Sequence, residues 1–320
     1  MQNGGGSLIQ VRNLNVTYHS FGETKQAVRD VSFSLNSGET LGFLGESGSG
    51  KSTIGWAILG MIEPPHEASG EVVYNNFNVL AASEGKLRRY RWKEVAMIFQ
   101  TAMNSLDPLV TIKKSFVQLL IGKGIADKEE GAVEIAVNLL RYVGLSPKVL
   151  DMYTFELSGG MRQRVSIALA IACNPKILIA DEPTTALDTV NQFSVLANMR
   201  KLKEERKIDA MILITHDVEI QMIMADRIAI TLKGRIVEEG SKEEMINDPK
   251  HPYTRLLLQS VTSANITKIE AATGNNVKFE DGKDGCPFLA QCPYAMPKCA
   301  ESFPEPKAFS KTHTVYCYIY

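Results

Sequence analysis

The segment that most constrains the fold of this chain is GESGSGKS, residues 45–52, which fits the pattern G-x-x-x-x-G-K-[ST]. A short apolar segment at 40–44 comes directly before it, and its composition is typical of a buried strand. The residues after it have helical spacing, with apolar side chains expected on one side at Ile54, Ala57, Ile58 and Met61. We therefore expect an α/β fold in which a glycine-rich turn joins a buried strand to a helix.

The same turn has the chemistry of a phosphate-binding loop. Its glycines let the backbone turn tightly and point N–H groups inward, and the helix N-terminus adds partial positive charge. Lys51 would reach the β- and γ-phosphates of a nucleotide, and the Ser52 hydroxyl would coordinate Mg²⁺. The residues expected to bind ATP here are Gly45, Glu46, Ser47, Gly48, Ser49, Gly50, Lys51, Ser52 and Thr53. The alternative is a surface turn with an unrelated lysine, which the flanking strand and helix disfavour.

An acidic pair follows a second apolar run, at residues 177–180. Asp181 would emerge at the C-terminal end of a buried parallel strand, where the ligand sites of α/β proteins lie. There Asp181 can hold Mg²⁺ through water, and Glu182 is placed to polarise the water that attacks the γ-phosphate. The alternative is a strand that ends in two solvated acids, and the phosphate-binding loop in the same chain disfavours it.

The sequence LSGGMRQR begins at Leu157. Ser158, Gly159 and Gly160 would open a helix with free N–H groups, which makes a second anion site in the chain. LSGG before a Gln/Arg-rich helix and the Asp181 strand resembles the signature of the ATP-binding cassette (ABC) ATPases. In that family two cassettes pair head to tail, so that ATP lies between the phosphate loop of one and the signature of the other. The resemblance therefore implies that residues 158–160 also bind ATP.

Four further residues match the family one by one. Tyr18 resembles the aromatic residue that stacks on adenine, and Gln100 resembles the glutamine that senses Mg²⁺ and the attacking water. Asp188 resembles the acid that communicates across the dimer, and His216 resembles the switch histidine that bonds to the γ-phosphate. Alone, Tyr18 could be an exposed strand tyrosine and His216 a structural histidine, but the ordered set favours function. The implied catalytic residues are Glu182, His216 and Gln100, and the implied Mg²⁺-binding residues are Ser52, Gln100 and Asp181.

The resemblance also implies the fold, that of an ABC nucleotide-binding domain of the P-loop NTPases. This is an α/β fold with a RecA-like core, an antiparallel β portion and an α-helical subdomain. Segments 8–16 and 27–35 alternate apolar and polar residues, as strands with one wetted face do. We expect the ATP-binding domain over residues 1–260, with the helical subdomain at about 101–157, and a cysteine-rich extension over residues 261–320.

Three segments point to one branch of the family. MIFQTAMNSLDPLVTI, LSGGMRQR and HPYTRLLLQSV together look like the oligopeptide/dipeptide (peptide and nickel) importer subfamily, and the resemblance covers nearly the whole chain. Two departures stand out. Thr101–Ala102 replaces the usual Asp–Pro, and Ala290–Gln291 replaces a common Pro–Arg. Neither change removes a catalytic residue, so we expect this cassette to hydrolyse ATP.

The composition limits the partners of the chain. A formal net charge of −1 gives no electrostatic reason to expect nucleic acid. No apolar run approaches the roughly 18 residues of a membrane-spanning helix, and the N-terminus does not resemble a signal peptide. We therefore expect a cytoplasmic protein, in which disulfides are rare and clustered cysteines indicate a metal first.

Four of the five cysteines lie close to the C-terminus, at Cys286, Cys292, Cys299 and Cys317. Zinc knuckles usually bring ligands in closer C-x₂₋₄-C pairs, whereas wider spacing suits four-cysteine ligation of an iron–sulfur cluster. The tail also resembles the C-terminal segment that carries a [4Fe–4S] cluster in some members of the subfamily. We therefore expect these four cysteines to hold such a cluster, with a structural role as a staple of the tail. Structural zinc and free or disulfide-bonded cysteines are the alternatives. The fifth, Cys173, is expected to be a small buried apolar side chain.

The resemblance implies ATP hydrolysis that powers solute import, with di- or oligopeptides as the expected cargo and nickel or oligosaccharides as alternatives. It implies as partners a second ABC ATPase subunit, identical or homologous, two transmembrane permease subunits and, indirectly, an extracytoplasmic solute-binding protein. The chain would then lie at the cytoplasmic face of the membrane, attached through the permease. A soluble ABC ATPase acting on ribosomes or DNA repair complexes is the alternative from another class. Two cassettes in one chain or a long coiled-coil insertion would be expected there, and the sequence shows neither.

Overall fold

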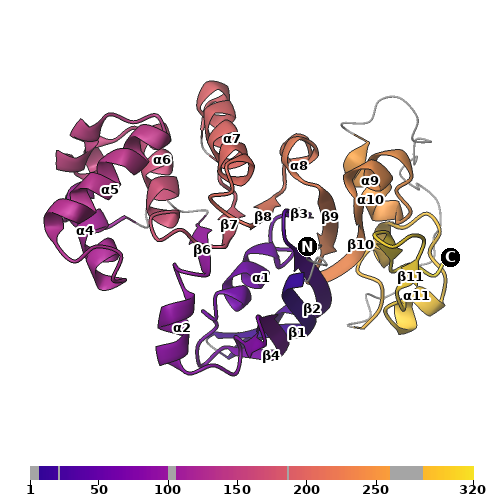
Figure 1. Ribbon diagram of the computed structural model, residues 1–320. Coiled ribbons are helices and arrows are strands. Elements are labelled where there is room, and N and C mark those ends of the chain that lie inside the picture. Colours follow the sequence, from indigo (N-terminus) through magenta and orange to yellow (C-terminus); the bar gives the residue numbers. More distant parts are fainter. Residues whose placement is uncertain (1–6, 21, 100–105, 186, 260–283) are drawn as a thin grey trace, which may run out of the picture. The chain divides into compact units, whose positions relative to one another are not determined.

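The computed structural model of the chain describes residues 7–20, 22–99, 106–185, 187–259 and 284–320. Two compact units are present, coloured by sequence in Figure 1. The first, here the loop unit, comprises residues 1–81 and 213–320, and the second, here the signature unit, comprises residues 82–212. The boundary between them falls within β8 (Ala210–Thr215).

An antiparallel sheet forms one part of the loop unit. Its strand order is β2 (Glu23–Asn36), β1 (Ser7–Ser20), β4 (Glu67–Tyr74) and β5 (Phe77–Asn78). Alternate residues of β2 are buried, among them Val31, Phe33 and Leu35, while the residues between them are more exposed. The alternation of apolar and polar residues in segments 8–16 and 27–35 therefore predicted these strands and their wetted face.

A second set of strands in the loop unit includes the strand before the phosphate-binding loop. Here β3 (Thr40–Leu44) pairs in parallel with β9 (Arg227–Leu232), and β10 (Arg235–Ser241) pairs antiparallel to β9. Every residue of β3 is buried, as its apolar composition predicts. Before residue 260, the described helices of the unit are α1 (Lys51–Ile58), α8 (Val218–Met224), α9 (Lys242–Asn247) and α10 (Pro252–Leu258).

Helix α1 is shorter than the sequence predicts. Ile54, Ala57 and Ile58 are buried as expected, but the helix ends at Ile58 and Met61 is exposed. The cause is Gly60, which takes a left-handed conformation with φ of 64° and stops the helix, as glycine commonly does after a last turn. The expectation for Met61 was therefore wrong.

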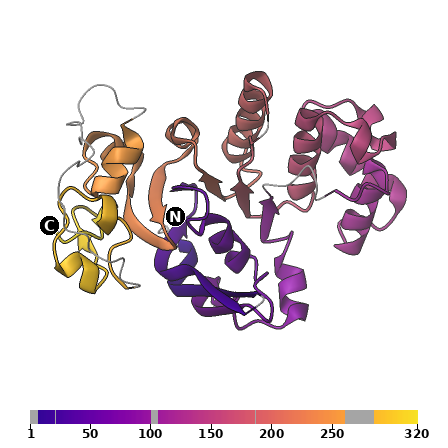
Figure 2. The same ribbon diagram turned by 180° about the vertical axis from the view of Figure 1, so that it is seen from behind.

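Residues 284–320, here the cysteine segment, pack within the loop unit. The short strand β12 (Thr314–Val315) pairs antiparallel with β10, and β11 (Lys307–Ala308) pairs with β12. Two short helices, η3 (Leu289–Gln291) and α11 (Lys298–Glu301), complete the segment. Seen from behind in Figure 2, the yellow segment lies beside the orange helices α9 and α10. Phe288 joins a hydrophobic core with Tyr253, Leu258 and Met245 of these helices.

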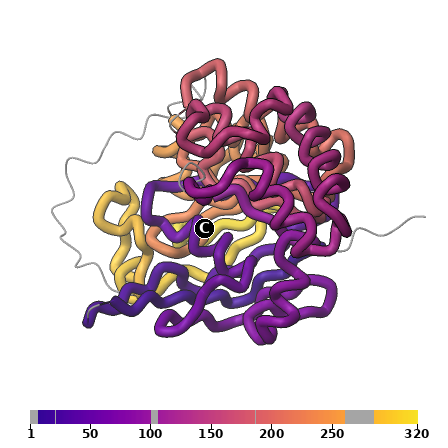
Figure 3. Tube along the Cα trace, turned by 90° about the vertical axis from the view of Figure 1, so that its left-hand side faces the viewer, coloured from indigo at the N-terminus to yellow at the C-terminus, as the bar shows by residue number. Residues whose placement is uncertain are grey.

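The signature unit combines two parallel strands with a group of helices. The strand β6 (Val95–Ile98) pairs in parallel with β7 (Ile177–Asp181). The helices among the described residues of this unit are α2 (Glu84–Tyr90), α4 (Ile112–Gly122), α5 (Glu129–Tyr142), η1 (Pro147–Asp151), η2 (Thr154–Glu156), α6 (Gly159–Ala170) and α7 (Thr189–Glu204). Among them α4 packs on α5 and α5 on α6, and the magenta helices group together in Figure 1 and Figure 3. Among the described residues, no helix combines the length and the apolar character that crossing a membrane requires.

Candidate functional site

Residues 45–50 form a tight loop between β3 and α1, as the sequence predicts, and Lys51 and Ser52 begin the helix. Gly48 and Gly50 have positive φ values of 79° and 98°, which glycine adopts readily. The loop has an exposed crest at residues 46–48, while Ser49, Gly50 and Lys51 are buried beneath it. Loop and helix therefore present backbone N–H groups at the start of α1, where a helix favours an anion.

The Lys51 ammonium lies folded beneath this crest. Its Nζ donates hydrogen bonds to the carbonyl oxygens of Gly45 at 2.7 Å and Glu46 at 2.8 Å, and it lies 3.4 Å from the Ser49 hydroxyl. The Ser49 hydroxyl is bonded in turn to the Thr231 hydroxyl of β9 at 2.9 Å. The Lys51 ammonium is thus held by oxygen atoms of the loop itself.

One amide of the crest bonds to a residue far away in the sequence. The backbone N–H of Glu46 donates to the Tyr253 hydroxyl at 3.3 Å. Tyr253 belongs to α10 and is itself buried, and burial raises its pKa to about 12. The phosphate-binding loop therefore contacts the HPY segment (residues 251–253) directly.

Tyr18 lies near the start of α1. Its hydroxyl bonds to the Thr53 hydroxyl at 3.3 Å, and its ring makes an edge contact with His66 at 4.9 Å between centroids. Partial burial raises the pKa of Tyr18, although the bond to Thr53 acts in the opposite direction. These contacts hold the ring beside the first turn of α1.

His216 follows the end of β8 in the loop unit and is exposed. The next residue, Asp217, caps α8 by accepting hydrogen bonds from the backbone N–H groups of Glu219 and Ile220. The histidine is therefore presented to solvent at a strand end, in a position set by the capped helix that follows.

The acidic pair lies at the end of β7 in the signature unit. Asp181 is the last residue of that strand, as the sequence predicts, and both Asp181 and Glu182 are buried. Glu182 has a positive φ of 47°, which is unusual for a residue with a side chain. The Thr185 hydroxyl donates to Glu182 Oε2 at 3.1 Å. The carboxylate is thus oriented by the turn that follows the strand.

The signature segment opens α6 as the sequence predicts. Ser158 is the N-cap residue, and its hydroxyl accepts a hydrogen bond from the Met161 N–H at 3.3 Å. The first turn contains no acidic side chain, so its partial positive charge is not offset locally. Gly160 has no space for a side chain, because an added Cβ would lie 2.7 Å from the side chain of Asn191.

Asp188 is the N-cap residue of α7. Its carboxylate accepts hydrogen bonds from the backbone and side-chain N–H groups of Asn191 at 2.9 and 2.6 Å, and these bonds lower the pKa of Asp188. Arg164 of α6 donates to the Asn191 Oδ1 atom at 2.8 Å. Asp188 and the signature helix are thereby joined through one asparagine. Gln100, like Thr101–Ala102, lies outside the described residues.

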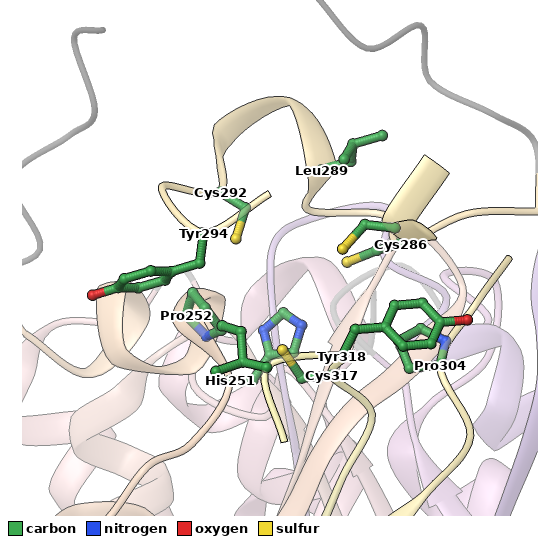
Figure 4. A pocket seen from close by; sticks show the side chains of 11 residues that line it. His251, Pro252, Cys286, Leu289, Cys292, Tyr294, Pro304, Cys317 and Tyr318 are labelled. Atoms are coloured by element: carbon green, nitrogen blue, oxygen red, sulfur yellow. The ribbon is translucent and has the colours of Figure 1, made fainter. Parts of the chain in front are cut away.

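All four C-terminal cysteines line a single pocket in the cysteine segment. Figure 4 shows Cys286 and Cys292 on one side of it and Cys317, with His251, on the other. The backbone N–H of Cys286 donates to the Cys299 carbonyl at 2.8 Å, which fixes the spacing of these two residues. Burial raises the pKa of Cys286 to about 12 and that of Cys292 to about 11, and it raises the pKa of Cys317 as well.

The shared pocket does not by itself make these cysteines a metal site. Within the described part of the chain, no group of three or more His, Cys, Asp or Glu residues is arranged to hold a metal ion. All five cysteines are free thiols in the structure, and Cys173 is buried, as expected. The four cysteines thus line one pocket, but among the described residues they do not form a set of metal ligands.

Sequence reasoning missed a buried carboxylate that organises this region. Glu238 of β10 is fully buried and accepts hydrogen bonds from the backbone N–H groups of Lys250 and His251 at 2.7 and 2.8 Å. Its Oε1 atom also bonds to His313 Nε2 at 2.7 Å. The HPY segment was noted only as a mark of the subfamily. The strand pattern of β10 gave no sign that its glutamate faces inward.

Comparison with known families gives two matches. Residues 28–185 match the family model described as ABC transporter. Residues 237–299 match the model described as oligopeptide/dipeptide transporter, C-terminal region. The second match includes the HPY segment and three of the four C-terminal cysteines.

Individual proteins give the same result over almost the whole chain. The dipeptide transport ATP-binding protein DppD of Bacillus subtilis is 37% identical, over 98% of this chain and 94% of that protein. The oligopeptide transport ATP-binding protein OppD of the same organism is 40% identical, over 96% and 87%. Among solved structures, the dimeric ATP-binding cassette MJ0796 in a post-hydrolysis state with ADP and Pi is 30% identical, with a TM-score of 0.66 over 73% of this chain and 98% of that one.

Proposed function

The chain belongs to the ABC transporter family, among the ATP-binding subunits of oligopeptide and dipeptide transporters, and we propose that it hydrolyses ATP to power the import of di- or oligopeptides. The geometry of residues 45–52 supports this best. A strand and a loop with two left-handed glycines precede α1, and the buried Lys51 is the first residue of that helix, which is the form of a phosphate cradle. The peptide cargo rests on the likeness to dipeptide and oligopeptide transport proteins along the whole chain.

In the proposed reaction, Lys51 exchanges its bonds to the Gly45 and Glu46 carbonyls for bonds to the β- and γ-phosphates of ATP. Tyr18 stacks on the adenine. Ser52 and Asp181, with Gln100, supply the oxygen atoms that Mg²⁺ prefers. Bound Mg²⁺ neutralises charge that develops on the phosphates.

Hydrolysis itself is assigned to Glu182 and His216. The Glu182 carboxylate, oriented by the Thr185 hydroxyl, positions and polarises the attacking water. His216 donates to the γ-phosphate. Residues 158–160 and Asp188 act across a pair of cassettes, so that the helix N-terminus of α6 meets the ATP held by the partner's loop.

The proposed partners follow from this arrangement. A second ATP-binding subunit, identical or homologous, completes the two ATP sites, and two transmembrane permease subunits convert their closure into transport. A solute-binding protein delivers the peptide from outside. The chain then lies at the cytoplasmic face of the membrane, with the ATP-binding domain at residues 1–260 and the extension at residues 261–320.

The catalytic assignment is tested with Glu182→Gln in the assembled complex. The amide keeps the shape of the side chain but cannot act as a base, so we expect ATP binding to persist and turnover to fall by about 10²-fold or more. Glu204→Gln, an exposed position on α7, is the matched control and should hydrolyse ATP like the parent. Parental turnover in Glu182→Gln would contradict the assignment.

The cargo is tested with the complex reconstituted in vesicles. The complex is isolated from membranes through this chain, and its ATP hydrolysis is measured with the solute-binding protein and candidate solutes. Stimulation by di- or oligopeptides is expected. Stimulation by nickel or an oligosaccharide alone would contradict the proposed cargo, and isolation with ribosomes or repair proteins would contradict the transporter.

We further propose that Cys286, Cys292, Cys299 and Cys317 hold a [4Fe–4S] cluster that staples the cysteine segment. The observation that supports it is that all four thiols line one pocket. Four cysteine thiolates are the usual ligand set of a [4Fe–4S] cluster. Protein purified without oxygen should contain iron and sulfide in equal amounts. Serine at any of the four positions should abolish both, whereas Cys173→Ser should not, and zinc without sulfide would contradict the cluster.

A further inference from the structure

His251 links the cysteine pocket to the rest of the loop unit. It is the N-cap residue of α10, and it is buried to 1% exposure. Its backbone N–H donates to Glu238 Oε2, and its Nδ1 atom accepts a hydrogen bond from the Tyr253 N–H at 3.1 Å. Since a backbone donor faces Nδ1, this nitrogen carries a lone pair, and the proton of the neutral ring is on Nε2.

The Nε2 atom is buried and has no hydrogen-bond partner among the residues that the structure describes. A buried donor is rarely left without a partner in a native protein, so such a group usually meets a ligand, a water or an ion. His251 lines the same pocket as the four cysteines, and Figure 4 shows its ring at the side of Cys317, across from Cys292.

The other polar side chains around the pocket do not offer a comparable donor. The Tyr318 hydroxyl bonds to the Ser302 hydroxyl at 2.6 Å. The Tyr294 hydroxyl points away from the pocket in Figure 4. His313 does not line the pocket, and its Nε2 bonds to Glu238 at 2.7 Å. His251 thus supplies the pocket's buried N–H.

We propose that the His251 Nε2–H donates a hydrogen bond to a sulfur atom of the cluster held by Cys286, Cys292, Cys299 and Cys317, so that His251 is a positioning residue and not a ligand. This inference rests on the cluster assigned above. An N–H donor at sulfur stabilises added negative charge, so it favours the reduced form and raises the reduction potential. The hydrogen bond from the Tyr253 N–H to Nδ1 holds the ring in the orientation that this requires, and the bond from the His251 backbone N–H to Glu238 fixes the backbone that carries the ring.

Two substitutions separate the roles of the two ring nitrogens. His251→Asn keeps an acceptor near the position of Nδ1, and asparagine is a favoured N-cap residue, but it removes the donor at Nε2. His251→Gln places an amide N–H near the position of Nε2 and gives up the cap. The cluster of the full chain, purified without oxygen, is titrated with a reductant and followed by electron paramagnetic resonance.

We expect His251→Asn to lower the equilibrium constant for one-electron reduction about tenfold, which corresponds to about 59 mV. His251→Gln should stay near the parental value. In parent protein with ¹⁵N-labelled histidine, pulsed resonance of the reduced cluster should show a coupled nitrogen, a measurement that needs no variant.

Three outcomes would overturn the inference. A parental potential in His251→Asn, or no nitrogen coupling in a parent that contains iron and sulfide, would overturn it and leave the cluster standing. A parent without iron and sulfide would overturn the cluster and this inference together.

Discussion

Two glycines of the phosphate-binding loop share a backbone conformation but differ in their surroundings, and this difference predicts unequal costs of substitution. Gly48 and Gly50 both have positive φ, so alanine at either position is strained by about 1–2 kcal/mol. A Cβ at Gly48 would meet nothing within 4 Å, whereas a Cβ at Gly50 would lie 2.4 Å from the carbonyl oxygen of Ala27. That oxygen is backbone and cannot rotate away, so the chain must shift.

The added cost of such overpacking is about 1–3 kcal/mol. Gly50→Ala should therefore lower the free energy of unfolding by about 2–5 kcal/mol, and Gly48→Ala by about 1–2 kcal/mol. The entropy that alanine removes from the unfolded chain is the same in both variants and cancels from their difference. Urea denaturation of the purified chain, followed by circular dichroism, measures both values.

The effect of these two substitutions on ATP binding should not follow their effect on stability. The space beside Gly48 is open because the exposed crest of the loop is where phosphate is proposed to bind, so Gly48→Ala should weaken ATP binding while it remains the more stable variant. Equal free energies of unfolding for the two variants would refute the steric reasoning. Parental ATP affinity in Gly48→Ala would refute the place assigned to the phosphates.

Two other substitutions follow from the described contacts. Lys51→Ala should lower ATP affinity about tenfold or more without unfolding the chain, because hydrogen bonds to a charged group are worth about 1.5–3 kcal/mol. Binding of a fluorescent ATP analogue checks this, with exposed Lys86→Ala as the control. For Glu244, burial alone would raise the pKa, but bonds from the Ser310 hydroxyl, the Ser241 N–H and hydroxyl, and the Thr312 hydroxyl lower it from 4.5 to about 2. The ionised Glu244 carboxylate therefore stabilises the folded chain above pH 4.5, and this contribution is lost as the pH falls to about 2. Ser310→Ala should make that loss smaller. Urea midpoints measured at about pH 5 and about pH 3 for the parent and the variant would show the difference.

Local patterns in the sequence predicted those parts of the fold that depend on neighbouring residues. The apolar run of β3 and the glycines after it predicted the phosphate-binding loop, because a buried strand and a tight turn each leave a local signal. The cap at Ser158 was predicted for the same reason. Helix α1 was predicted too long, since Gly60 lies within an otherwise helical pattern and its left-handed conformation is set only in the folded chain.

Contacts between distant residues were not predictable in this way. The bond from the Glu46 N–H to the Tyr253 hydroxyl joins residues 207 positions apart. The inward-facing Glu238 is bonded by the backbone N–H groups of Lys250 and His251 and by the His313 ring, and none of these residues lies in β10. The four cysteines were recognised as a group by their type, but only the folded chain shows that His251 shares their pocket.

The pairing of β10 with β12 has a consequence for how the chain is made. Glu238 and His313 are 75 positions apart in the sequence, and β12, which pairs with this edge of β10, follows immediately after His313. While a ribosome synthesises the residues between them, β10 has an open edge whose N–H and C=O groups can pair with another nascent chain. Products of premature termination within that interval would keep the open edge permanently. We expect such products to aggregate or to be degraded, even though the phosphate-binding loop and the signature helix have both been completed by then.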